Sequence, residues 1–235
     1  TLLNLHGLYY TTYGSHWEWA PPCYHFRMPY WEHMGTFLKY FERLSYLMSH
    51  GHHVCDVAIM YPVTPYEAEL NGDMARDTAF ELGEKLMAAG INFDFIDHQS
   101  LARAKVKEGK LLVEDAGASY QALVFPAMDA VRWESIETAA AFAEDGGTVI
   151  AVGALPSVTD RAGRNDAKLA ELNERAFQRE CRLKKTAEAV EFIREAFIPD
   201  LRSLNGTVRA LHRKVGPQDV YLTMDAQPGD VVEFR

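Results

Sequence analysis

Residues 54–62 read VCDVAIMYP, and the prediction of the fold begins with this run. Its apolar part, Val57 to Tyr61, has the length and the β-branched content of a strand that is buried on both faces. Pro62 has no amide proton to donate to a β-ladder, so we expect the strand to end there. Strands of this kind are typical of a parallel sheet that lies between two layers of helices.

Two later runs have the same character. Tyr120–Pro126 also ends in proline, and Gly147–Gly153 ends in glycine. Segments with helical periodicity separate the three runs. We therefore expect an open α/β fold in which Val57–Tyr61, Ala122–Phe125 and Thr148–Val152 are neighbours in one parallel sheet.

Composition and charge argue against several classes of partner. The 235 residues are 48% hydrophobic and 24% charged, which is ordinary for a globular protein. The net charge of -9 argues against a nucleic-acid or membrane partner. Cys23, Cys55 and Cys181 are odd in number and far apart, so we expect free thiols. The sequence starts at Thr1 inside an apolar segment, and we expect a piece of a longer protein.

The rest of the chain divides into an aromatic loop, helices and short strands. Leu2–Leu5 has the pattern of a buried strand, and the aromatic segment from Tyr9 to Trp31 is expected to be an ordered loop. An amphipathic helix follows, from Pro29 to about His50. Further along we expect a loop at Thr64–Asn71, a helix at Met74–Ala89 capped by Asp73, a strand at Ile91–Ile96, a hairpin around Glu108–Lys110, helices at Arg132–Glu144, Asp166–Gln178 and Lys184–Phe197, and strands at Thr207–His212, at Asp219–Thr223 and from Gly229 onward.

Several histidines raise the question of a metal site. His50, His52 and His53 follow the end of the first helix, where cations suit the helix dipole. No cysteine or carboxylate completes a ligand set at a recognisable spacing. The sequence therefore favours a solvated helix end, with no metal and no cofactor.

Two short motifs near the start could face a ligand. His6 and Gly7 follow a buried strand, where a polar group can either face a site or be a hydrogen-bonded core histidine. Trp17-Glu18-Trp19 places a carboxylate between two indoles, which suits sugar binding and a raised carboxyl pKa. The alternative is a loop anchored by its tryptophans, with Glu18 exposed.

Nucleotide and nucleophile motifs are missing from the sequence. No G-x-G-x-x-G pattern follows the first predicted strand of the sheet, and Pro62 and Pro65 remove amide donors that a phosphate would need. A flavodoxin-like redox or nucleotide protein is therefore disfavoured. No G-x-S-x-G or G-x-C-x-G elbow is present either.

Several motifs, in order, resemble the α-L-rhamnosidases of glycoside hydrolase family 106. The residues that carry the resemblance extend over nearly the whole chain: Leu5-His6-Gly7, Pro29-Tyr30-Trp31, Arg43–Leu47, Asp56–Pro62, Tyr120–Pro126, Gly146–Ala151, His212-Arg213 and Asp219-Val220-Tyr221. The family implies a (β/α)₈ catalytic barrel, then a domain like that of class I glutamine amidotransferases, then β-sandwiches. A similar domain trimerises β-galactosidases of family 42.

The resemblance implies how this chain divides. Residues 1–51 would be the last βα unit of the barrel, residues 52–205 a flavodoxin-like α/β domain with helices on both faces, and residues 206–235 the start of a β-rich domain. Glycosidases need two opposed carboxylates, which a single βα unit cannot supply, so we assign no catalytic residue. The residues expected to line the sugar site are His6, Tyr10, Trp17, Glu18 and Trp31. The expected partners are a carbohydrate substrate, the remainder of the parent enzyme and a second copy of the chain. The alternative is a non-catalytic accessory or oligomerisation module.

Overall fold

The computed structural model describes residues 24, 26, 28–161 and 163–235. The chain forms two compact units, Thr1–Gly51 and His52–Arg235, and each is described by itself. The strand predicted at Leu2–Leu5 and most of the predicted aromatic loop lie outside the described residues.

The described part of the first unit is a helix with a short 3₁₀ turn before it. The turn η2 covers Trp31–His33, and α1 covers Met34–Ser49. Apolar residues recur on one face of α1, and the rings of Phe37 and Phe41 meet edge to face with centroids 4.6 Å apart. Gly51 has a φ of 63°, the left-handed conformation that commonly ends a helix. The predicted helix is confirmed, with its α-helical part starting at Met34.

A five-stranded parallel sheet forms the centre of the second unit. Its strands are β2 (Val57–Met60), β3 (Phe93–Ile96), β7 (Ala122–Pro126), β9 (Thr148–Val152) and β11 (Arg182–Leu183). The order across the sheet is β11-β9-β7-β2-β3. Val57 pairs with Ala122, and Ala122 pairs with Thr148, each in parallel register. The prediction that these three runs are neighbours in one parallel sheet is confirmed.

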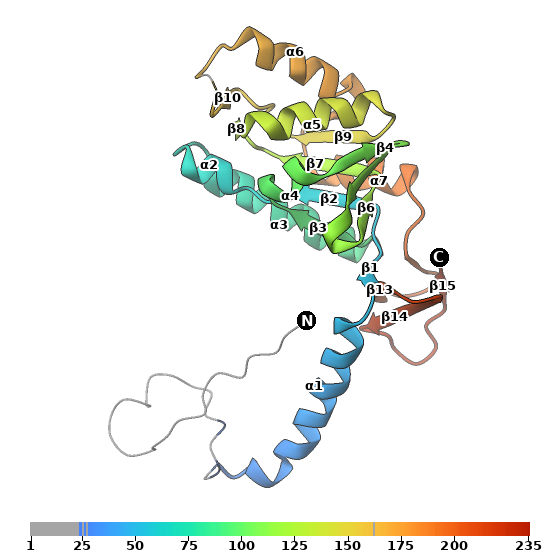
Figure 1. Ribbon diagram of the computed structural model, residues 1–235. Helices are drawn as coiled ribbons and strands as arrows, with labels where there is room; N and C mark the ends of the chain where they lie inside the picture. The colour runs from blue at the N-terminus through green and yellow to red at the C-terminus, as the bar shows by residue number, and fades with distance from the viewer. Residues whose placement is uncertain (1–23, 25, 27, 162) are drawn as a thin grey trace, which may run out of the picture. The chain divides into compact units, whose positions relative to one another are not determined.

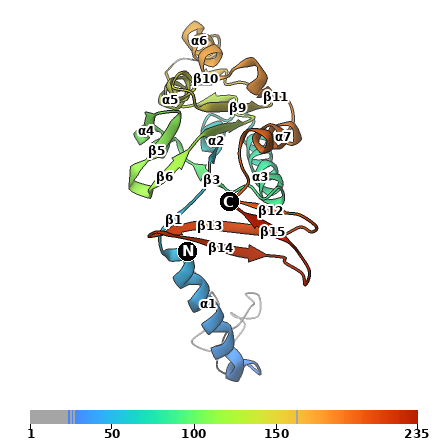
Figure 2. The same ribbon diagram turned by 90° about the vertical axis from the view of Figure 1, so that its right-hand side faces the viewer.

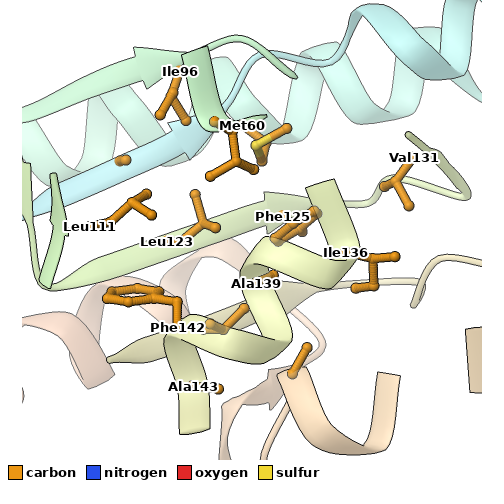
Figure 3. Close-up of a cluster of buried hydrophobic side chains, with 14 of the residues drawn as sticks. Met60, Ile96, Leu111, Leu123, Phe125, Val131, Ile136, Ala139, Phe142 and Ala143 are labelled. Atoms are coloured by element: carbon orange, nitrogen blue, oxygen red, sulfur yellow. The ribbon is translucent and has the colours of Figure 1, made fainter. Parts of the chain in front are cut away.

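Helices cover both faces of this sheet (Figure 1). On one face lie α3 (Gly72–Ala88) and α7 (Thr186–Ala196), and on the other α5 (Trp133–Glu144), with α6 (Ala167–Ala176) packed against α5. Alternate residues of each strand therefore enter two separate cores, since successive side chains point to opposite faces. Figure 3 shows the core beneath α5, where Phe125 and Phe142 are fully buried.

Small antiparallel elements complete the second unit. β4 (Lys105–Lys107), β5 (Lys110–Val113) and β6 (Ala118–Tyr120) form one sheet. Glu108 and Gly109 have φ values of 54° and 68°, as a two-residue hairpin turn of type I′ requires, so the predicted hairpin is confirmed.

The end of the chain is also built of strands (Figure 2). β13 (Arg209–Val215) and β14 (Gln218–Met224) form a hairpin, and β1 (His52–His53) pairs with β13. β12 (Leu201–Ser203) pairs with β15 (Val232–Phe234), and β8 (Ala130–Val131) pairs with β10 (Val158–Thr159). The β-structure predicted after residue 206 is present.

Two local predictions around residues 63–74 were wrong. Val63–Glu67 forms a short helix, α2, instead of a loop, because a proline in the first turn of a helix loses no intrahelical hydrogen bond. Asp73 does not cap α3, because that helix begins at Gly72 and Asp73 lies inside its first turn. The Asp73 carboxylate accepts a hydrogen bond from the Tyr66 hydroxyl at 2.6 Å instead. None of the helices in the described ranges is long and apolar enough to cross a bilayer.

Candidate functional site

Most residues predicted to line a sugar site lie outside the described part of the chain. These residues are His6, Tyr10, Trp17 and Glu18. Trp31 is described, in the 3₁₀ turn η2, and its side chain is exposed. An exposed indole is compatible with ligand contact, but the prediction of an aromatic wall is not tested by this position.

The carboxyl-terminal edge of the parallel sheet carries two neighbouring surface cavities. Ligands of open α/β sheets commonly bind at this edge. One cavity, of about 230 Å³, lies between α2, β8 and β10. The other, of about 650 Å³, lies beside α4 (His98–Arg103) and the start of α5. Figure 1 shows α2, β8 and β10 together at this end of the sheet.

Arg132 lies between these two cavities and is held by two carboxylates. Its guanidinium donates to Glu67 at 2.6 Å and to Asp160 at 3.5 Å, and Asp160 also accepts from the backbone N–H of Trp133 at 2.8 Å. The guanidinium of Arg161 covers one face of the Trp133 ring, 4.1 Å from its centroid. These charges and this ring face already have partners within the chain, so the edge offers little to a phosphate group or a stacked sugar.

Six carboxyl groups elsewhere in the described residues have displaced pKa values. In each of them the displacement is downward. At Glu81 and Glu144 the main cause is a hydrogen bond from a lysine or an arginine, which favours the carboxylate. The groups with lowered pKa values are Glu81, Asp94, Asp97, Glu144, Glu174 and Asp219. A glycosidase needs one carboxylic acid whose pKa is raised, and none of these six fits that role.

A second cluster of polar groups lies at the amino-terminal edge of the sheet. The carboxylate of Asp94, on the edge strand β3, forms hydrogen bonds with three side chains. Its Oδ1 lies 2.8 Å from His53 Nδ1, and its Oδ2 accepts from Cys55 Sγ at 3.3 Å and from the Tyr120 hydroxyl at 3.0 Å. We call these four residues the Asp94 cluster. The atoms offered by His53, Cys55 and Asp94 lie within 4.8 Å of one another, close enough to share one metal ion.

The Asp94 cluster is largely buried, and its titrations depend on one another. Burial lowers the pKa of His53, but the hydrogen bond and the charge of Asp94 outweigh that effect and raise it. Burial and the same charge raise the pKa of Cys55, so its thiol is protonated at neutral pH. Burial raises the pKa of Asp94, but the contacts of His53 and the other donors lower it overall. Asp94 is therefore an anion that three neighbours stabilise.

Sequence reasoning missed this cluster. His53 was predicted to lie at a solvated helix end, whereas it lies in strand β1 with its side chain only 19% exposed. Asp94 comes 41 residues after His53, so no spacing links the two. One signal was available, because Asp94 stands between Phe93 and Phe95 in an otherwise apolar strand. A lone carboxylate in such a strand needs a partner when the strand is buried.

Comparisons with known proteins identify the family. A family model described as glycoside hydrolase 106, α-L-rhamnosidase, matches residues 23–232. The structure of a rhamnosidase from Novosphingobium sp. PP1Y is 18% identical, with a TM-score of 0.54, and the match covers 79% of this chain and 18% of that one. The apo exo-carrageenase GH42 from Bacteroides ovatus is 16% identical over 71% of this chain and 22% of its own, with a TM-score of 0.42, too low to support an argument. No curated protein matches the chain.

The first of these structures is similar in fold, and the chain spans only 18% of its length. The family match covers most of the 235 residues, including the whole parallel sheet. This chain therefore belongs to the α-L-rhamnosidase family, glycoside hydrolase family 106.

Proposed function

We propose that this chain is part of an α-L-rhamnosidase that hydrolyses rhamnose-containing glycans. The observation that carries this proposal is the family match over residues 23–232. The likeness in fold to a rhamnosidase structure agrees with it. The substrate of the parent enzyme is inferred from the family alone.

The finer division of the chain belongs to this proposal. Residues 1–51 would supply the last βα unit of a catalytic barrel, and residues 52–205 a flavodoxin-like domain similar to that of glutamine amidotransferases. Residues 206–235 would begin a β-rich domain. The helix α1 and the five-stranded parallel sheet are consistent with this division. The chain spans 18% of the length of the similar rhamnosidase, which leaves room for a barrel elsewhere in the parent.

We further propose that the catalytic carboxylates lie mostly outside this chain. A retaining or inverting glycosidase needs an acid and a base or nucleophile on opposite sides of the scissile bond. Among the residues that the structure describes, every displaced carboxyl pKa is lowered, and most of these carboxylates pair with cations at the surface. This favours a non-catalytic accessory role for residues 52–235, in carbohydrate binding or in assembly with a second copy.

The direct test is the activity of the isolated 235-residue chain on an aryl α-L-rhamnoside. We expect no turnover above the uncatalysed rate, whereas the full-length parent should be active. Turnover by the isolated chain that disappears in Glu18→Gln would place the catalytic acid within this chain and overturn the proposal. Sedimentation equilibrium of the same chain tests assembly, because an oligomerisation module should form dimers or trimers at micromolar concentration.

The proposed sugar wall is tested in the full-length parent with Trp17→Ala and His6→Ala. A wall residue should weaken substrate binding or turnover while leaving the melting temperature nearly unchanged. A residue that only fills an interface should lower the melting temperature, since truncating a buried tryptophan costs roughly 3–5 kcal/mol. Normal kinetics with lost stability in both variants would contradict the wall.

A further inference from the structure

We propose that His53, Cys55 and Asp94 form a zinc-binding site at the amino-terminal edge of the parallel sheet. His53 and Cys55 lie on the segment that leads into β2, and Asp94 lies on the neighbouring edge strand β3. The three side chains supply an imidazole nitrogen, a sulfur and a carboxylate oxygen. Zn²⁺ commonly binds nitrogen, sulfur and carboxylate oxygen together, whereas Mg²⁺ and Ca²⁺ prefer oxygen ligands alone.

The geometry fits a tetrahedral ion. Zinc binds nitrogen, oxygen and sulfur at roughly 2.0–2.3 Å, so two of its ligands stand roughly 3.5 Å apart. The Nδ1–Oδ1 distance between His53 and Asp94 is 2.8 Å, and the Sγ–Oδ2 distance between Cys55 and Asp94 is 3.3 Å. All three ligand atoms fall within 4.8 Å of one another. Small side-chain rotations would place an ion between them, where it would replace the proton that Cys55 donates to Asp94.

The charges balance when zinc is bound. A Cys55 thiolate and an Asp94 carboxylate carry two negative charges, which match the charge of Zn²⁺, and His53 binds as a neutral imidazole. Without an ion, the Cys55 thiol and the His53 imidazole both form hydrogen bonds to the one carboxylate of Asp94. Each ion that binds releases the thiol proton of Cys55 to solvent, together with the second imidazole proton in those molecules where His53 is protonated, so the step is balanced.

The cluster has an outer contact and an opening to solvent. The Tyr120 hydroxyl donates to Asp94 Oδ2 at 3.0 Å, and such contacts orient a carboxylate ligand. The side chain of Asp94 is 33% exposed and that of His53 is 19% exposed, whereas Cys55 is buried. An ion can therefore enter from the side of Asp94 and keep a water as its fourth ligand.

The alternative is a hydrogen-bonded cluster that only stabilises the fold. Buried polar networks that serve stability are normally satisfied at every atom. Here His53 Nε2 and the neighbouring Asn92 Nδ2 are buried without a hydrogen-bond partner. Zinc bound through His53 Nδ1 would leave these two atoms as they are, so the contacts of Nδ1, Sγ and the Asp94 carboxylate carry the zinc proposal, and the titration below separates it from this alternative.

The first experiment is a zinc titration of the chelator-treated 235-residue chain against a chromophoric competitor. We expect one zinc per chain. His53→Gln and Cys55→Ser should weaken binding at least about 100-fold, and Tyr120→Phe about tenfold, since outer contacts account for roughly 10- to 100-fold in metal affinity. Cys181→Ser is the matched control, because Cys181 is also a buried free thiol but lies away from the cluster.

The second experiment uses Co²⁺ as a spectroscopic probe of the ligands. Cobalt in this site should show the visible bands of a tetrahedral complex and a thiolate-to-cobalt charge-transfer band. The charge-transfer band should disappear in Cys55→Ser and persist in Cys181→Ser. This readout reports the sulfur ligand directly and is independent of rhamnosidase activity.

Several outcomes would overturn the zinc site. These are no saturable uptake of zinc, wild-type affinity in Cys55→Ser, or a cobalt complex without charge transfer. Unchanged affinity in His53→Gln would place the ion on exposed histidines such as His52 and would also count against the site. If Cys55→Ser does not fold, Tyr120→Phe decides, because it removes only a hydroxyl group, and unchanged zinc affinity there overturns the proposal.

Discussion

Each edge of the parallel sheet carries carboxylates that accept hydrogen bonds, but the donors at the two edges differ in kind and in exposure. At the carboxyl-terminal edge, Arg132 is paired with Glu67 and Asp160, and these side chains are 34%, 45% and 43% exposed. At the amino-terminal edge, Asp94 accepts from a histidine, a thiol and a phenol. The Asp94 side chain is 33% exposed, but its donors Cys55 and Tyr120 are buried, at 4% and 5% exposure.

The difference shows that exposure decides what a polar contact contributes. An exposed ion pair exchanges its partner for water at little cost, and surface pairs typically contribute about 0–1 kcal/mol. A buried donor that loses its acceptor cannot find water, which costs roughly 1–3 kcal/mol. The carboxyl-terminal edge should therefore tolerate substitution, whereas the amino-terminal edge should not.

The largest effect is expected for Asp94→Ala. This change removes the acceptor of His53, Cys55 and Tyr120 together, so we expect a loss of about 3 kcal/mol in the free energy of unfolding at neutral pH. Urea denaturation of the metal-free chain measures it. A decrease in the free energy of unfolding of less than about 1 kcal/mol, as for an exposed ion pair, would contradict the claim that the amino-terminal edge tolerates substitution less well.

An intermediate effect is expected for Asp97→Ala, which removes the N-cap of α4. The Asp97 carboxylate accepts from the backbone N–H groups of Gln99 at 2.8 Å and Ser100 at 2.9 Å. Losing such a cap costs about 1 kcal/mol. Gln99→Ala is the control, because its backbone N–H remains and its side chain plays no part in the cap.

The cost of Asp97→Ala should depend on pH. Burial raises the pKa of Asp97, but the hydrogen bonds from Ser100 and Gln99 outweigh it and lower the pKa below the usual 3.8. A lowered pKa in the folded state adds stability that is present above about pH 4 and is lost as pH falls through the folded value. The cost should thus be present at neutral pH and smaller at about pH 2. A cost that grows toward acid would contradict this sign.

The smallest effect is expected for Glu67→Gln at the carboxyl-terminal edge. This substitution removes the charge of a half-exposed partner of Arg132, so the loss should not exceed about 1 kcal/mol at low salt. It should fall toward zero at about 1 M salt, where the Debye length is about 3 Å. Urea denaturation at the two salt concentrations measures it. A large loss that is independent of salt would mean that Arg132 depends on Glu67 as a buried ion would.

The central architecture could be predicted because its signals are local. Val57–Met60, Ala122–Pro126 and Thr148–Val152 are continuous apolar runs, and such runs suit strands covered on both faces. The helix at Val63–Glu67 was not predicted, because Pro65 was taken as the mark of a loop. Pro65 lies in the first turn of this helix, where a missing amide proton breaks no intrahelical hydrogen bond.

What the sequence by itself determined is the alternation of buried strands and amphipathic helices, together with the type I′ hairpin at Glu108 and Gly109. These features depend on periodicity and on backbone conformations that only neighbouring residues control. The tertiary structure alone decided that Asp94 meets His53, Cys55 and Tyr120. The parallel pairing of β2 with β3 places Asp94 opposite Ala58, and this register brings its carboxylate to residues far away in the sequence. Burial then makes their contacts consequential, since a polar group without water depends on the few partners that the fold supplies.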